Sequence, residues 1–180
     1  MSRRQNTQAQ IRNLTVSAML CALGVLILAL GAVIEVIDLS VAVIASLLCV
    51  YAVIEIGGAY PWLIWIVTSL VSLLLLPAKT PVVFYTLLAG YYPILKEKIE
   101  RLPMLLSYLI KWGVATLSSL SIYAVSVLFM PTLLEGFEAW WLLLLLYVAM
   151  IFVFFMYDFA LSSLITFYFR RLQKRMRIHK

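Results

Sequence analysis

The chain has 180 residues, of which 65% are apolar and 12% are charged, and its formal net charge is +6. This composition is typical of polytopic membrane proteins. In a soluble protein such a positive charge would suggest nucleic acid as a partner. Here the cations lie beside apolar segments, so membrane topology and anionic lipid explain the charge, and no nucleic-acid partner is expected.

The first apolar run, Leu14–Ile34, has 21 residues and no charge. As a helix it is about 30 Å long, which matches the hydrocarbon core of a bilayer. Arginines precede this run and acids follow it, so the amino terminus is expected in the cytoplasm. A secretory signal peptide cleaved near Ala29-Leu30-Gly31 is the rival interpretation, although its apolar region would have only about 7–15 residues.

Six apolar runs predict an all-α polytopic membrane protein, with six transmembrane helices in one bundle and a single domain over residues 1–180. The predicted spans are 14–36, 40–56, 59–76, 81–101, 103–130 and 139–169. Ser40 is expected to cap the second span, Gly57-Gly58 to form a tight turn, and Pro61 to open the third span. Gly90 and Pro93 interrupt the fourth span, which is therefore tilted, kinked or partly re-entrant.

The distribution of cations predicts the orientation of all six spans. Twelve of the fourteen Lys and Arg residues lie in the amino tail, the segment Lys96–Arg101 and the carboxyl tail. We interpret Lys96–Arg101 as a surface helix end or loop. Glu35, Asp38 and Glu135 lie on the opposite side. Both termini are therefore predicted to be cytoplasmic.

The spans carry none of the residue sets that membrane hydrolases use. HExxH, serine–lysine, serine–histidine and GxGD patterns are missing, and the only histidine is His179 in the basic tail. Cys21 and Cys49 lie inside apolar runs without CxxC spacing, so they are read as small buried residues rather than a disulfide or metal site. We expect no enzymatic activity, no cofactor and no metal.

Three charged residues lie at membrane depth: Glu55, Lys111 and Asp158. An ionised group at a helix centre costs about 2.5–3.5 kcal/mol on insertion scales, so each needs a partner or water. Glu55 is close to the inner turn and can extend to the interface. Lys111 and Asp158 lie at similar depth on consecutive antiparallel spans and are predicted to form an intramembrane ion pair. A role in gating or coupling, or a substrate contact, is the alternative for this pair.

A solute site open to the outside would need aromatic faces and a cation for an anionic group. Interfacial belts account for most of the aromatic residues. The outer residues that remain as candidates for substrate binding are Lys79, Tyr85, Tyr123, Trp141 and Tyr147, with the link Glu35–Ser40 as a candidate lid.

Ala18 and Ala22 are one helical turn apart in the first span, and such small residues let a second helix approach closely in lipid. With the span count and orientation, this AxxxA motif resembles the substrate-binding S components of energy-coupling factor (ECF) vitamin transporters. The segments AMLCALGVLILALG, IEIGGAY, GYYPILKEKIE and YDFALSSLITFY look like a branch of such proteins, and we find no segment that marks riboflavin, thiamine, biotin or folate binders. The resemblance implies that Ala18 and Ala22 dock onto a membrane coupling subunit, which sits on a cytoplasmic ATPase pair, and that the chain captures a vitamin or similar small solute.

Two other classes fit the same chain. One is a membrane scaffold or assembly protein similar to the MreD cell-shape proteins. The other is a stand-alone proton-coupled carrier that uses Asp158 and Lys111, which an internal inverted repeat would favour. We find no such repeat in the sequence.

Overall fold

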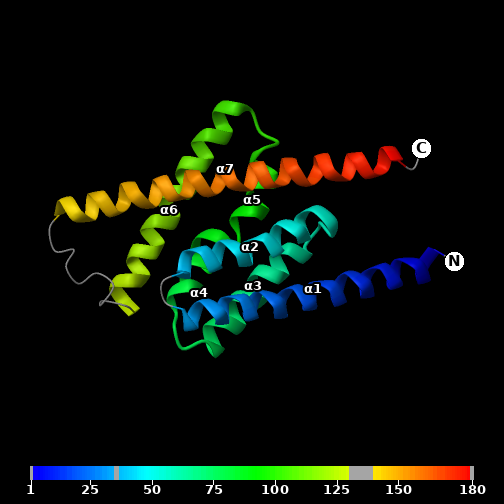
Figure 1. The fold of residues 1–180 in the computed structure, drawn as a ribbon, viewed down its shortest axis with the longest axis horizontal. Helices are drawn as coiled ribbons and strands as arrows, with labels where there is room; N and C mark the ends of the chain where they lie inside the picture. The colour runs from blue at the N-terminus through cyan, green and yellow to red at the C-terminus, as the bar shows by residue number, and fades with distance from the viewer. Residues whose placement is uncertain (1, 35–36, 130–139, 179–180) are drawn as a thin grey trace. The chain divides into compact units, whose positions relative to one another are not determined.

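The computed structural model describes residues 2–34, 37–129 and 140–178, and within these ranges every regular element is a helix. The prediction of an all-α protein is confirmed. In chain order the elements in Figure 1 are α1 (Ser2–Val33), α2 (Asp38–Glu55), α3 (Tyr60–Leu75), α4 (Thr80–Phe84), the π-helix η2 (Tyr85–Ala89), α5 (Tyr92–Ile99), α6 (Met104–Phe129) and α7 (Trp140–Ile178).

Four described segments are long and apolar enough to cross a membrane: Gln10–Val33, Asp38–Glu55, Met104–Leu128 and Trp140–Tyr168. They indicate a membrane-associated protein. Helix α3 is also apolar but has only 16 residues, about 24 Å of helix. The predicted fourth span is divided among α4, η2 and α5. The count of six spans therefore stays a prediction.

Local sequence signals explain most of the helix ends. Gly57 and Gly58 have φ values of 67° and 64°, a conformation that glycine adopts without a steric penalty, so they form the turn between α2 and α3 as predicted. Pro61 lies in the first turn of α3, also as predicted. The expectation for Ser40 is wrong: α2 begins at Asp38, so Ser40 lies inside the helix, and no side chain caps it.

The chain divides into two compact units, an amino-terminal unit (Met1–Trp112) and a carboxyl-terminal unit (Gly113–Lys180). Helix α6 is continuous through this boundary. In the amino-terminal unit α1, α2 and α3 pack against one another, and α4, η2 and α5 pack against α2 (Figure 1). The carboxyl-terminal unit contains the rest of α6 and all of α7.

Two glycines of α1 allow its neighbours to approach closely. A Cβ atom at Gly24 would lie 3.0 Å from Cγ2 of Thr68 on α3, and one at Gly31 would lie 2.9 Å from Cγ1 of Val41 on α2. Helices in lipid associate through such close packing because burial from water does not drive them together. Gly24 and Gly31 therefore lie on the face of α1 that packs against α3 and α2.

The break in the fourth apolar run occurs where the sequence predicts it. The Gly90 N–H donates to the carbonyl of Tyr85, five residues earlier, at 2.7 Å. The indole N–H of Trp65 donates to the carbonyl of Thr86 at 3.3 Å, inside the π-helix. A Cβ atom at Gly90 would lie 2.5 Å from Cδ1 of Trp65, so this position requires glycine.

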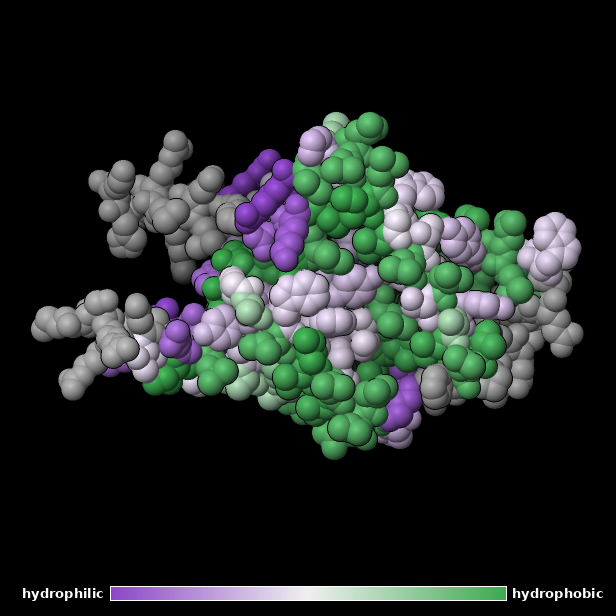
Figure 2. Space-filling view, turned by 180° about the vertical axis from the view of Figure 1, so that it is seen from behind, coloured by the Kyte–Doolittle hydropathy of each residue, from purple (hydrophilic) through white to green (hydrophobic). Residues whose placement is uncertain are grey.

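Apolar side chains cover much of the face in Figure 2. The exposed ones on α3 alone include Leu63, Ile66, Val67, Leu70, Leu73, Leu74 and Leu75. Soluble monomers rarely expose such continuous apolar surface, whereas a lipid-facing surface requires it.

Candidate functional site: charges on α5 and α6 and the outer face of α1

A buried cation lies in the last turn of α5. The Lys96 side chain is 1% exposed, its Nζ lies 3.1 Å from Oε1 of Glu100, and the same Nζ is 5.8 Å from the centre of the Tyr92 ring. The interpretation of Lys96–Arg101 as a surface segment is therefore wrong for Lys96. It holds for Glu97, Lys98, Glu100 and Arg101, which are exposed.

Helical periodicity explains why Lys96 is buried while the charged residues next to it are exposed. Tyr92, Lys96 and Ile99 lie at positions i, i+4 and i+7 on one face of α5, and all three are buried. The neighbouring charged side chains lie on the other faces of the helix. There, water and lipid head groups can solvate them. The spacing of Lys96 from Tyr92 and Ile99 was the sequence signal for this burial, but the dense run of charges obscured it.

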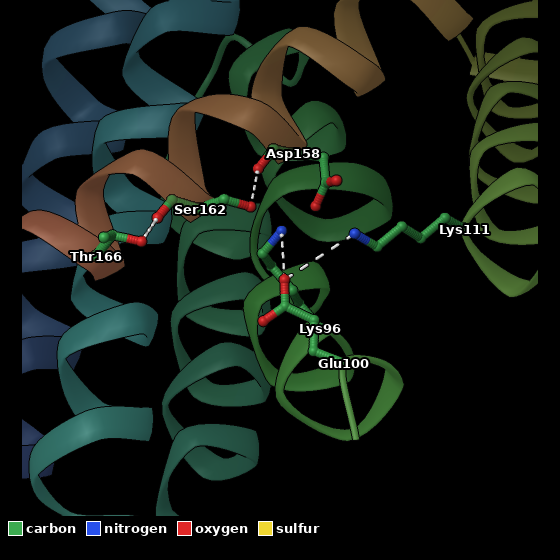
Figure 3. Close-up of polar contacts among 6 residues, drawn as sticks. All are labelled: Lys96, Glu100, Lys111, Asp158, Ser162 and Thr166. Carbon is green, nitrogen blue, oxygen red and sulfur yellow. Dashed lines mark hydrogen bonds and ion pairs between the residues drawn. The ribbon is translucent and has the colours of Figure 1, made fainter. Parts of the chain in front are cut away.

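Lys111 on α6 lies near the same acid. Its side chain is 12% exposed, and its Nζ lies 4.0 Å from Oε1 of Glu100. Figure 3 shows the Glu100 carboxylate joined to both Lys96 and Lys111. The Glu100 carboxylate therefore lies near two ammonium groups, one on α5 and one on α6, both in the amino-terminal unit. The sequence predicts Asp158, not Glu100, as the partner of Lys111.

Asp158, the predicted partner of Lys111, lies on α7 in the carboxyl-terminal unit. Its main-chain carbonyl accepts a hydrogen bond from the Ser162 hydroxyl at 3.0 Å, and the Ser162 carbonyl accepts one from Thr166 at 2.8 Å (Figure 3). The Lys111–Asp158 ion pair stays a prediction.

The two alanines predicted to dock a partner both face outward. Ala18 and Ala22 are exposed, while Ser17, Gly24 and Leu28, which lie on another face of α1, are buried. Helix α1 thus separates its small residues into two sets. Its glycines pack inside the unit, and its AxxxA pair faces out, where a second helix could approach the backbone.

The predicted solute-binding residues fall into both units. Lys79 Nζ donates to the carbonyls of Leu73 at 2.6 Å and Leu76 at 2.5 Å, so its ammonium caps the carboxyl end of α3. Tyr85 is 1% exposed and lies in the core of the amino-terminal unit. Tyr123, Trp141 and Tyr147 are exposed on α6 and α7 of the carboxyl-terminal unit. Glu35, of the candidate lid, and Glu135 lie outside the described residues.

Sequence reasoning missed a set of polar side chains inside the amino-terminal unit. The Cys49 Sγ lies 3.3 Å from the Tyr85 hydroxyl, and the Cys21 thiol points to the Ile64 carbonyl at 3.8 Å. Thr68 lies close enough to interact with Cys21 and Tyr85, although its Oγ1 meets hydrogen-bond geometry with neither. Cys49 is buried, as predicted, whereas Cys21 is only partly buried, and both lie beside polar groups.

Comparison with protein families, curated proteins and solved structures gives no match.

Proposed function

We propose that this chain is the substrate-capture subunit of an ECF-type importer for a vitamin or similar small organic solute. In this proposal it sits in the prokaryotic plasma membrane with both termini in the cytoplasm. A membrane coupling subunit binds it, and a cytoplasmic ATPase pair drives transport through that subunit.

The observation that carries the proposal is the outward orientation of Ala18 and Ala22. A helix that packs only inside its own unit has no need of small residues on its outer face, where Leu or Ile would meet lipid equally well. Small residues on that face instead allow a partner helix to come close to the backbone, and close packing is what supplies contact energy in lipid.

Co-purification tests this docking face. The tagged chain, purified from native membranes in mild detergent, should bring with it one multi-span protein and nucleotide-binding subunits with ATPase activity. Ala18→Trp or Ala22→Trp should abolish this association and ATP-driven uptake, because the indole holds the partner helix away from the backbone. Size-exclusion chromatography should show both variants inserted and folded.

Leu23→Trp is the matched control. Leu23 is also exposed but lies about 100° around the helix from Ala22, so tryptophan there should leave the association intact. Equal association of all three variants would refute docking through this face. Misfolding of the alanine variants alone would show that the face is internal packing. Association with cell-wall synthesis proteins would support the scaffold function instead, and uptake driven by a proton gradient without ATP would support the carrier.

A further inference from the structure

Helix α3 carries three buried hydroxyls that lack a hydrogen-bond partner among the described residues, and Ser17 on α1 is a fourth hydroxyl of this kind. Thr68 and Ser72 are 0% exposed and Ser69 is 7% exposed. Within the part of the chain that the structure describes, no group meets hydrogen-bond geometry with the side-chain oxygen of any of these three α3 residues. Thr68 and Ser69 lie in the middle of α3, and Ser72 lies in its last turn.

Serine and threonine in a helix usually satisfy themselves by donating to a carbonyl one turn earlier. Seven described residues do so here: Thr15, Ser46, Thr116, Ser118, Ser119, Ser162 and Thr166. The hydroxyls of Thr68, Ser69 and Ser72 have the same option in α3 but are not in that geometry. Their side-chain oxygens are buried instead.

The groups around Thr68 are also polar. Gly24 on α1 gives the Thr68 side chain its space, and Cys21 and Tyr85 lie close enough to interact with it. The Tyr85 hydroxyl in turn contacts Cys49. This set brings together hydroxyl and thiol groups from α1, α2, α3 and η2, and none of its side chains is a carboxylate, an ammonium or an imidazole.

We propose that Thr68 and Ser72 bind ordered water inside the amino-terminal unit, and that this water connects their hydroxyls to the Cys49–Tyr85 pair. Each buried water in a protein makes about 2–4 hydrogen bonds, and hydroxyls both donate and accept, so this set supplies enough partners. The uncharged character of the set selects a neutral ligand over an ion.

X-ray radiolysis of the purified full chain in nanodiscs tests the proposal. Radiolysis makes hydroxyl radicals where water lies, so it oxidises thiols and phenols next to ordered water even where bulk solvent does not reach. Cys49 and Tyr85, at 0% and 1% exposure, should be oxidised although bulk solvent does not reach them. In the double variant Thr68→Val/Ser72→Ala, oxidation of Cys49 and Tyr85 should be lost, while Tyr123 should be unchanged.

Ser118→Ala is the matched control, because Ser118 is buried but already bonded to the Val114 carbonyl. It should leave the oxidation of Cys49 and Tyr85 unchanged. Wild-type protein in which these two residues resist oxidation would overturn the proposal, and so would unchanged oxidation in the double variant.

Thermal unfolding gives a second measurement. Replacing an unpaired buried hydroxyl by an apolar group of similar shape is neutral or stabilising. A hydroxyl that holds water behaves otherwise, because its removal leaves that water with fewer partners. Thr68→Val should therefore lower the melting temperature, and a rise would show that the hydroxyl is unhydrated.

Discussion

The Nζ atom of Lys96 lies 3.1 Å from Oε1 of Glu100, and the two side chains differ sharply in exposure, at 1% and 46%. A buried ammonium is therefore paired with a carboxylate that reaches solvent or the lipid head groups. One turn of α5 brings the two together, since they are four residues apart.

We expect Glu100→Gln to lower stability by about 1–2 kcal/mol. Removing one partner of a buried pair leaves the other charge poorly compensated, although the exposure of Glu100 reduces the effect. Glu97→Gln is the matched control: Glu97 is 44% exposed and pairs with Arg101, which is 75% exposed, at 2.5 Å. Loss of the Glu97–Arg101 ion pair should change stability by less than about 0.5 kcal/mol. Thermal unfolding in detergent measures the stability of both variants. Equal losses of stability would show that the burial of Lys96 does not make its pairing with Glu100 more stabilising than the exposed pair.

The predicted Lys111–Asp158 ion pair is tested by a double-mutant cycle. Lys111→Met or Asp158→Asn alone should cost about 3–5 kcal/mol and lower the folded yield, and the double substitution should recover much of it. Additive losses would refute the pairing. In that case coupling between Lys111→Met and Glu100→Gln should be measured, because Glu100 lies 4.0 Å from Lys111 Nζ.

Gly90→Ala should destabilise the amino-terminal unit by about 1–3 kcal/mol, because the added methyl group overpacks the site. Its Cβ would lie 2.5 Å from Trp65 Cδ1 and 2.9 Å from the Tyr85 carbonyl oxygen. Gly113→Ala is the control: nothing lies within 4 Å of its Cβ position, so this change should stabilise α6 by about 0.5–1 kcal/mol. Melting temperatures of the two variants should move in opposite directions.

Cysteine accessibility in intact cells tests the orientation. In a variant without Cys21 and Cys49, a cysteine at Glu135 should react with an impermeant thiol reagent, and one at exposed Lys98 should not. Lys98 is expected on the cytoplasmic side of the membrane, where most of the Lys and Arg residues lie. Reaction at Lys98 but not at Glu135 would reverse the predicted topology.

The sequence by itself determined the helical class, the turn at Gly57-Gly58, the helix start at Pro61 and the interruption near Gly90. These features depend on interactions within a few residues. A glycine with positive φ, or a proline in the first turn of a helix, acts on the backbone whatever packs around it. The length and apolarity of α1, α2, α6 and α7 are likewise visible without tertiary structure.

Only the tertiary structure decided which face of each helix is inside. Helix α1 carries no charge between Leu14 and Val33, and no amphipathic pattern separates inward Gly24 from outward Ala18 and Ala22. The burial of Lys96 and the placement of Thr68 opposite Gly24 depend on residues distant in sequence. In a lipid-embedded chain hydrophobicity marks what lies in the membrane, whereas close packing between particular helices decides what is buried in the protein.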